Sequence, residues 1–306
     1  MNKETISIAV FSYNSEGTIL ETLNSIQNQD YGSQFIELLF GDDGSKDNTQ
    51  KIIMDWLAIH GSSFHNIIVN MSSINKGVVA NFNSTCKLAT SGWIKPIAAD
   101  DLLAYNCISE FYSFVIKNET PCAFCKVQKF TGEDKLEILP KNNYYFSLSA
   151  QDQFENLLID NFIPAPGCFL KVSLLQYIGY AEENLCMEDY PMWLKIAAAN
   201  IQMPLLNKTL VQYRIGNSLS KNKYKLTNPI LDYDTYQVKK RFLSKLNKNK
   251  IVTIFYKIEI SSYKLSNLIK VKLFRNKKNR VTHTISLFSR LMSPIFTICK
   301  IKSKIK

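Results

Sequence analysis

Three adjacent carboxylate pairs in this 306-residue sequence could take part in chemistry: Asp42–Asp43, Asp100–Asp101 and Glu188–Asp189. In the second pair, an apolar, small-residue run over 91–99 ends abruptly at two like charges. Adjacent carboxylates repel each other, and removing either from water costs several kcal/mol unless a positive group lies nearby. This pair therefore marks either a solvated helix start or a place where a cation and an anionic ligand bind.

The pairs belong to an alternation of strands and helices that would position them. Apolar β-type runs occupy 6–11, 35–40, 66–70 and 93–99, and a helical repeat of apolar residues follows each of the first three. This alternation predicts an α/β fold with a parallel sheet and helices on both faces. In such sheets ligands bind beyond the carboxyl ends of the strands.

Polar residues follow all four predicted strands. In chain order they are Tyr13–Asn14, Asp42–Asp43, Asn75–Lys76 and Asp100–Asp101. Each alone is typical of a helix cap or turn, but four at one edge of one sheet predict a ligand site. The glycine-rich dinucleotide fingerprint and the GxxxxGK phosphate loop are absent from the sequence after the first strand.

Four segments together resemble the family-2 glycosyltransferases. They read FSYNSEGTILETLNSIQNQ, LLFGDDGSKDNT, NKGVVANFNSTCKLATSGWIKPIAADD and MEDYPMWLKIAAA, in the family's order, across about residues 5–215. The resemblance implies an inverting enzyme with the GT-A nucleotide-sugar-binding fold, in which a mostly parallel central sheet is flanked by helices. It also implies a nucleotide-sugar donor, expected to be UDP-linked.

The resemblance also implies residues for the donor site. Phe11 and Tyr13 would line the base pocket, and Asp42 or Asp43 would hydrogen-bond the uracil or ribose. Lys76 matches the family's loop that reaches the nucleotide. The alternatives are a capped helix start for the Asp42–Asp43 loop and a solvated side chain for Lys76.

By the same resemblance, Asp100 would bind the ribose or sugar, and Asp100 and Asp101 would hold Mg²⁺ or Mn²⁺ at the diphosphate. Such ions prefer carboxylate and phosphate oxygens and would neutralise the repulsion within the pair. The alternative is a helix N-terminus that places acids against its dipole. Two departures from the family reduce the number of expected metal ligands. Ala98 replaces an Asp that many members have, and 213–217 lacks their His.

The Glu188–Asp189 pair precedes an apolar helical run. By resemblance, Asp189 is the general base that deprotonates the acceptor hydroxyl, with Glu188 beside it in the catalytic site. A partly desolvated carboxylate suits this role because it accepts a proton readily. A helix cap is the alternative. The segment 161–171 resembles the loop before the acceptor site.

Charge divides the chain near residue 220. Residues 1–220 carry a net charge of −8 and residues 221–306 a net charge of +19. We expect a catalytic domain over 1–220 and a basic amphipathic helical region over 221–306, with apolar stripes at 251–258 and 285–296. This region would either bind an anionic membrane surface or pack on the catalytic domain. Nucleic acid is not expected, because no aromatic and basic binding motif accompanies the charge.

Cysteine usage and the N-terminus favour a cytoplasmic protein. Seven scattered cysteines fit reduced thiols, and Cys122 and Cys125 are expected in a core strand rather than in a metal or redox site. Residues 1–5 are polar and lack a signal-peptide pattern.

The combined expectation is a peripheral enzyme at the inner face of the plasma membrane. Its acceptor would be a glycan or lipid-linked glycan, and family association suggests surface polysaccharide or lipopolysaccharide synthesis. The competing hypothesis is a non-catalytic sugar-nucleotide or glycan binder, suggested by Ala98 and the missing His. A nucleotidyltransferase would need a phosphate-binding loop near residue 13 that the sequence lacks.

Overall fold

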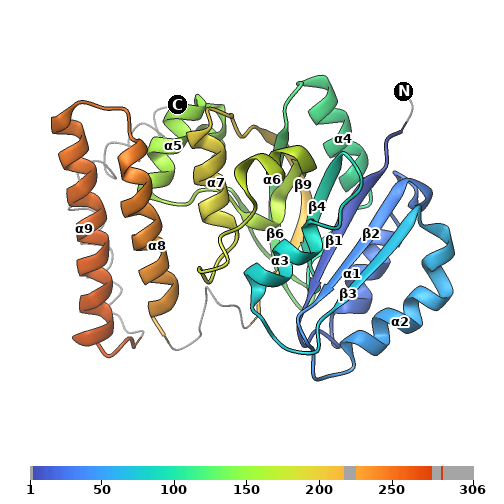
Figure 1. Ribbon diagram of the computed structural model, residues 1–306. Helices are drawn as coiled ribbons and strands as arrows, with labels where there is room; N and C mark the ends of the chain where they lie inside the picture. Colours follow the sequence, from blue (N-terminus) through green and yellow to red (C-terminus); the bar gives the residue numbers. More distant parts are fainter. Residues whose placement is uncertain (1–2, 217–224, 278–283, 285–306) are drawn as a thin grey trace. The chain divides into compact units, whose positions relative to one another are not determined.

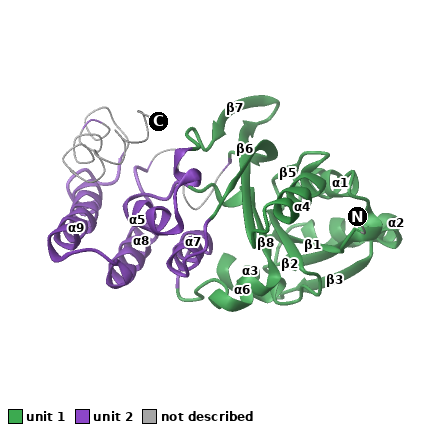
Figure 2. Ribbon diagram, turned by 90° about the horizontal axis from the view of Figure 1, so that it is seen from above, with its two compact units in different colours: residues 1–143, 163–184, 203–215 green, residues 144–162, 185–202, 216–306 purple. Residues whose placement is uncertain are grey.

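The computed structural model describes residues 3–216, 225–277 and 284 (Figure 1). The chain groups into two compact units that interleave along the sequence (Figure 2). Unit 1 comprises Met1–Asn143, Ile163–Asn184 and Met203–Ile215, and unit 2 comprises Tyr144–Phe162, Leu185–Gln202 and Gly216–Lys306. A functional boundary near residue 220 stays a prediction.

The first four strands of unit 1 form the predicted parallel sheet. They are β1 (Ile6–Ser12), β2 (Ile36–Asp42), β3 (Asn66–Met71) and β4 (Trp93–Ala98), in the order β3-β2-β1-β4. All three neighbouring pairs are parallel. The polar residues that follow these strands therefore lie at one edge of the sheet, as the sequence predicts.

The sheet continues beyond β4 with mixed strand directions. Next along it come β8 (Cys168–Lys171), β6 (Cys122–Thr131), β9 (Leu205–Arg214) and β5 (Leu102–Leu103), while β7 (Asp134–Leu139) pairs with β6. β8 runs antiparallel to β4 and β6, whereas β9 runs parallel to β6. These pairings join strands that are distant in the sequence.

Helices cover both faces of the sheet (Figures 1 and 2). One face carries α1 (Ile19–Gln27), α2 (Thr49–His60) and α4 (Cys107–Lys117), and the other carries α3 (Val78–Cys86) and α6 (Val172–Ile178). Short 3₁₀ turns lie at Ser33–Phe35 (η1), Gly61–Ser63 (η2) and Ala165–Gly167 (η4). Leu23 of α1 and Phe111 of α4 are fully buried in the core on the strands. The predicted α/β fold is confirmed.

Cys122 and Cys125 lie buried in β6. Burial raises the pKa of the Cys122 thiol to about 12 and the pKa of the Cys125 thiol well above its ordinary value. Both thiols therefore stay protonated at neutral pH, which confirms the prediction of a core strand.

Unit 2 is helical. It contains α5 (Ala150–Ile159), α7 (Asp189–Ala198), α8 (Pro229–Phe242) and α9 (Lys250–Lys272), with 3₁₀ turns at Tyr144–Ser147 (η3) and Leu243–Lys245 (η5). α5 packs on α7 and α9, and α8 packs on α9. Ser149, Asn228 and Asn249 cap the N-termini of α5, α8 and α9 with side-chain oxygens that accept backbone N–H groups. The predicted helical C-terminal region is present.

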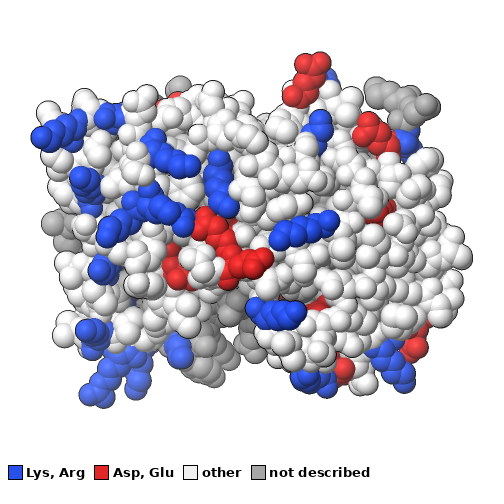
Figure 3. Space-filling model, in the orientation of Figure 1, with Lys and Arg blue, Asp and Glu red and all other residues white. Residues whose placement is uncertain are grey.

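α9 has two contrasting faces. Tyr256 and Ile260 are buried, whereas the predicted stripe Ile251, Ile254, Phe255 and Ile258 is 44–68% exposed. Lys and Arg side chains gather over α8 and α9 (Figure 3). The second predicted stripe, 285–296, lies outside the described residues.

Within the described part of the chain, no helix has the length and apolar character needed to cross a membrane.

Candidate functional site

The loops after β1 and β2 are tied together at the carboxyl edge of the sheet in unit 1. The Asn14 backbone N–H donates to Ser45 Oγ at 2.9 Å, and the Lys46 N–H donates to Asn14 Oδ1 at 2.8 Å. Asn14 adopts a left-handed φ of 49°, a conformation that Asn tolerates better than most residues. The neighbouring Tyr13 side chain is 47% exposed. A fixed loop therefore presents an aromatic ring to solvent.

Asp42 is buried and anchors this loop from inside. Its carboxylate accepts hydrogen bonds from Ser12 Oγ (2.8 Å), Ser45 Oγ (2.5 Å) and Gln50 Nε2 (2.6 Å). Burial acts to raise the pKa of Asp42, but these hydrogen bonds outweigh it and lower the pKa below its ordinary value. The side chain is thus a fixed anion that holds the loop in shape.

Asp43 connects the loop after β2 to the loop after β3. Its Oδ1 accepts the Lys76 N–H at 2.7 Å, and its Oδ2 accepts the Gly77 N–H at 2.8 Å. Gly77 has a left-handed φ of 91°, which glycine adopts without strain. Lys76 itself is exposed. Asp43 therefore sets the conformation of the segment that carries this lysine.

Phe11 lies between these loops and β4. It is half-buried and stacks on Phe82 of α3, with ring centroids 5.3 Å apart. Its partner in the sheet register is Ala98, which is exposed. The position beside the Phe11 ring in the sheet is therefore occupied by a small, exposed side chain.

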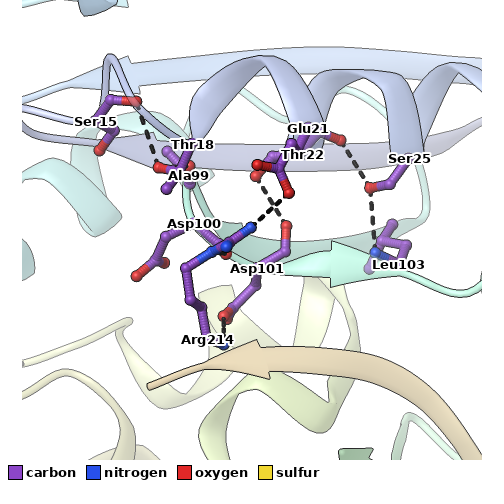
Figure 4. A network of polar contacts seen from close by, with 10 residues as sticks. All are labelled: Ser15, Thr18, Glu21, Thr22, Ser25, Ala99, Asp100, Asp101, Leu103 and Arg214. Atoms are coloured by element: carbon purple, nitrogen blue, oxygen red, sulfur yellow. Dashed lines mark hydrogen bonds and ion pairs between the residues drawn. The ribbon is translucent and has the colours of Figure 1, made fainter. Parts of the chain in front are cut away.

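The Asp100–Asp101 turn is held on two sides (Figure 4). Thr22 Oγ1 of α1 donates to the Asp101 carbonyl at 2.8 Å, and the Arg214 N–H of β9 donates to Asp101 Oδ1 at 2.9 Å. Thr18 Oγ1 donates to the neighbouring Ala99 carbonyl at 2.9 Å. The Asp100 carboxylate points away from the Arg214 guanidinium. Asp101 is thus held through its carbonyl and Oδ1, whereas the Asp100 carboxylate points away from these contacts.

The two carboxyl groups have raised pKa values. Burial is the main cause at both, and the charge of Asp100 adds to it at Asp101, whose pKa lies well above the ordinary value. The backbone N–H of Arg214 and the charge of Lys95 act in the opposite direction at Asp101. Without a bound cation, the pair therefore favours a proton, as expected for adjacent buried carboxylates.

The residues of the turn fit a metal ion that takes most of its ligands from a substrate. Asp101 Oδ2 is buried and has no hydrogen-bond partner among the described residues. No cluster of three acidic, Cys or His side chains occurs in the described part of the chain. Mg²⁺ is commonly held by one or two carboxylates together with substrate phosphates. Two carboxylates and a diphosphate would meet that requirement, so Asp100 and Asp101 stay predicted metal ligands.

Glu188 and Asp189 lie in unit 2, where Asp189 begins α7. The Glu188 side chain makes no capping hydrogen bond within the described residues, so the cap interpretation does not account for it. Asn161 Nδ2 donates to Asp189 Oδ2 at 3.3 Å. Desolvation outweighs this bond and the Tyr190 N–H bond, and it raises the pKa of Asp189. Desolvation and the charge of Asp189 raise the pKa of Glu188. Their catalytic roles stay predictions.

The sequence prediction missed two basic residues near the Asp100–Asp101 turn. Lys95 is fully buried in β4, and its Nζ donates to the carbonyls of Pro96 (2.6 Å) and Pro166 (2.8 Å). Arg214 contacts the turn through both its backbone and its side chain. A lysine inside an apolar strand run was the available signal for the first residue, and the Tyr213–Arg214 segment was the signal for the second.

Comparisons with known proteins give a match to a family model and similar solved structures. The model of the family described as glycosyl transferase family 2 matches residues 7–179. The structure of S. aureus TarS 1–349 in complex with UDP superimposes with a TM-score of 0.64 at 18% identity, covering 88% of this chain and 75% of that one. At this identity the likeness shows the fold, and the predicted GT-A architecture is confirmed.

Two curated bacterial relatives align over most of the chain. The poly(ribitol-phosphate) beta-glucosyltransferase of Bacillus spizizenii is 26% identical over 237 residues, which are 77% of this chain but 32% of that protein. The UDP-Glc:alpha-D-GlcNAc-diphosphoundecaprenol beta-1,3-glucosyltransferase WfgD of Escherichia coli is 27% identical over 232 residues, covering 74% of this chain and 83% of that protein. The chain thus spans about a third of the first relative and most of the second.

Proposed function

Because the chain belongs to glycosyl transferase family 2 and is therefore a glycosyltransferase, we propose that its donor is a UDP-linked sugar. The sugar is transferred to a glycan or lipid-linked acceptor, with inversion at the anomeric carbon. The proposed pathway is the synthesis of bacterial surface polysaccharide or lipopolysaccharide. Support comes from the two curated relatives: one is named for poly(ribitol-phosphate), and the other for UDP-Glc and a diphosphoundecaprenol-linked sugar.

One observation carries the proposal for the donor. The loops after β2 and β3 are locked together by the Asp43 carboxylate, which leaves Tyr13 and Lys76 exposed at the sheet edge where Asp100 is half-buried. An aromatic ring, a cation and an available carboxylate are the groups that would recognise a base, a phosphate and a ribose hydroxyl. We assign these contacts to the nucleotide of the donor.

A divalent ion would complete this site. Asp100 and Asp101 would hold it, and it would supply positive charge to the diphosphate as the bond to the sugar breaks. The protein itself orients the Asp101 carboxylate through the Arg214 N–H and holds the Asp101 backbone carbonyl through Thr22.

Asp189 is the proposed general base. Its carboxylate would take the proton from the acceptor hydroxyl as that oxygen attacks the anomeric carbon. Because the charge of Asp189 raises the pKa of Glu188, the pair favours a neutral Glu188 beside an ionised Asp189. The desolvation that raises the pKa of Asp189 also makes its ionised form a better proton acceptor.

We further propose that the basic C-terminal region binds an anionic membrane surface at the inner face of the plasma membrane. The stripe Ile251, Ile254, Phe255 and Ile258 is exposed on α9, a helix that also carries Lys250 and Lys257. Exposed apolar residues beside lysines are the features of a helix that lies in a membrane interface. The buried face of α9 packs on α5 and α8 within unit 2, which leaves its exposed face for the proposed membrane contact.

A panel of nucleotide sugars tests the proposal, with thermal unfolding and hydrolysis measured in Mn²⁺ and in EDTA. UDP-sugars should raise the melting temperature more than GDP-, CMP- or dTDP-sugars, and one of them should be hydrolysed or transferred. ¹H NMR of the product should show the inverted anomer. Stabilisation without turnover of any donor under any metal condition would favour the non-catalytic binder. If no nucleotide sugar stabilises the protein, the donor assignment is wrong.

A further inference from the structure

The Arg214 side chain reaches across the Asp100–Asp101 turn (Figure 4). Its Nε donates to the Asp100 carbonyl at 2.9 Å, and its Nη2 forms an ion pair with Glu21 Oε2 at 2.7 Å. The guanidinium therefore lies against the backbone of the turn whose Asp100 carboxylate is proposed to face the donor.

The guanidinium is fixed in position by its surroundings. Its central carbon lies 4.5 Å from the centroid of the Phe130 ring, the residue paired with Arg214 in the sheet. The side chain is only 18% exposed. A guanidinium on an aromatic face keeps its N–H groups at the rim, where they can bind an anion at little further cost in side-chain entropy.

Glu21, in contrast, is a replaceable partner. Its side chain is 56% exposed, and ion pairs with a carboxylate in that setting contribute little to stability. A phosphate offers the same guanidinium stronger, charge-assisted hydrogen bonds. Exchange of Glu21 for a phosphate oxygen would leave the bond from Nε to the Asp100 carbonyl intact.

We propose that Arg214 binds the diphosphate of the nucleotide donor and that Glu21 forms an ion pair with the Arg214 guanidinium until the donor binds. The inference rests on the proposed donor function and adds to it a residue that none of the expected site residues includes. Asp100, Asp101 and a diphosphate all carry negative charge, and 213–217 lacks the family's His. A guanidinium stays protonated at every physiological pH, so Arg214 supplies a permanent positive charge there.

The test compares ligands that differ only in their phosphates. UDP binding is measured by calorimetry and uridine binding by ligand-observed NMR, in Mn²⁺ and in EDTA. For Arg214→Gln, UDP affinity should fall about 10- to 100-fold while uridine affinity is unchanged. Arg214→Lys should fall between wild type and Arg214→Gln, because it keeps the charge without the planar fork.

Glu21→Gln should change UDP affinity in the opposite direction. Removal of the competing carboxylate should raise UDP affinity a few-fold at low salt, with uridine unchanged. This variant keeps the test decisive if Arg214→Gln fails to fold, since Glu21 is largely exposed.

Equal losses of UDP and uridine affinity in the Arg214 variants would show that Arg214 only supports the turn, and the inference would be overturned. Unchanged UDP affinity in both Arg214→Lys and Glu21→Gln would overturn it as well. Failure of the wild-type protein to bind UDP would instead contradict the proposed donor class, and this inference with it.

Discussion

The pKa of a key aspartate is shifted in opposite directions in the two units. In unit 1, hydrogen bonds from Ser12, Ser45 and Gln50 outweigh burial and lower the pKa of Asp42. In unit 2, desolvation outweighs the hydrogen bonds to Asp189 and raises its pKa. A carboxylate saturated with donors is a rigid anion that shapes a binding loop, whereas a desolvated carboxylate with fewer donors can accept a proton.

Asp100 and Asp101 lie in unit 1, but their pKa values are raised, as is that of Asp189 in unit 2. The cations that would stabilise both as anions are a metal ion and the Arg214 guanidinium. The comparison therefore assigns binding to the loops of unit 1 and proton transfer to α7 of unit 2, and the following predictions can break or sharpen that division.

The largest effect is expected at Asp189. Asp189→Asn keeps the shape of the side chain but removes the proton acceptor, so turnover should fall by about 10²- to 10⁴-fold. UDP affinity, measured by calorimetry, should change little. Glu188→Gln is the matched control and should show the smaller loss of turnover. Normal turnover in Asp189→Asn, or a loss explained by UDP affinity, would place the base elsewhere.

Asp43 should affect binding and stability instead. Asp43→Ala leaves the Lys76 and Gly77 N–H groups without their acceptor, at a cost of about 1–3 kcal/mol in the free energy of unfolding. UDP affinity should fall with it, because the Lys76 segment loses its fixed conformation. Urea unfolding and calorimetry measure the two effects. Asp55→Ala, which removes an exposed carboxylate from α2, is the control and should change neither. A stable Asp43→Ala protein would contradict the role assigned to this carboxylate.

Activity and binding should separate with pH. The base works in its ionised form and its pKa is raised, so turnover is lost as pH falls through that raised value, above the ordinary range for Asp. The loop shaped by Asp42 persists at the same pH, because the pKa of Asp42 is lowered. On the acid side, kcat should fall by about tenfold per pH unit, while UDP should still bind when its affinity is measured in EDTA, so that protonation of Asp100 and Asp101 does not release a metal ion. A parallel loss of kcat and UDP affinity would break the comparison.

The smallest effect is expected on α9. The double variant Ile254→Ser with Phe255→Ser removes exposed apolar area, and co-sedimentation with anionic liposomes should weaken about tenfold. Ile59→Ser on α2, where the side chain is 74% exposed, controls for general loss of apolar surface and should leave binding unchanged. If Ile59→Ser weakens liposome binding as much as the double variant does, α9 has no special role in membrane binding.

Local patterns were sufficient to predict β1 to β4 and the helices that follow the first three of these strands. A short apolar run and a helical period of 3.6 are encoded within about 10–15 residues, so Ile6–Ser12 and Ile19–Gln27 follow from the sequence. The polar residues that end these strands could be placed at one sheet edge by topology alone. Which of them is exposed could not be predicted, because it depends on contacts with other elements, such as Ser12 of β1 for Asp42 and the 76–77 segment for Asp43.

Long-range contacts explain what the sequence prediction missed. The partners of Arg214 are 113 and 193 residues away at Asp101 and Glu21. One of the two carbonyls that accept from the buried Lys95 belongs to Pro166, which is 71 residues away. The grouping of α5 and α7 with α8 and α9 likewise depends on packing that no local period reports.

The central claim is that the donor nucleotide binds at the carboxyl edge of the sheet in unit 1. Hydrogen–deuterium exchange of the full chain with and without UDP and Mn²⁺ tests it directly. The account predicts slower exchange in the loops at 11–14, 42–46, 75–77 and 98–101, with no change in α8 or α9. Unchanged exchange in all four loops while UDP is bound, or protection confined to unit 2, would contradict it.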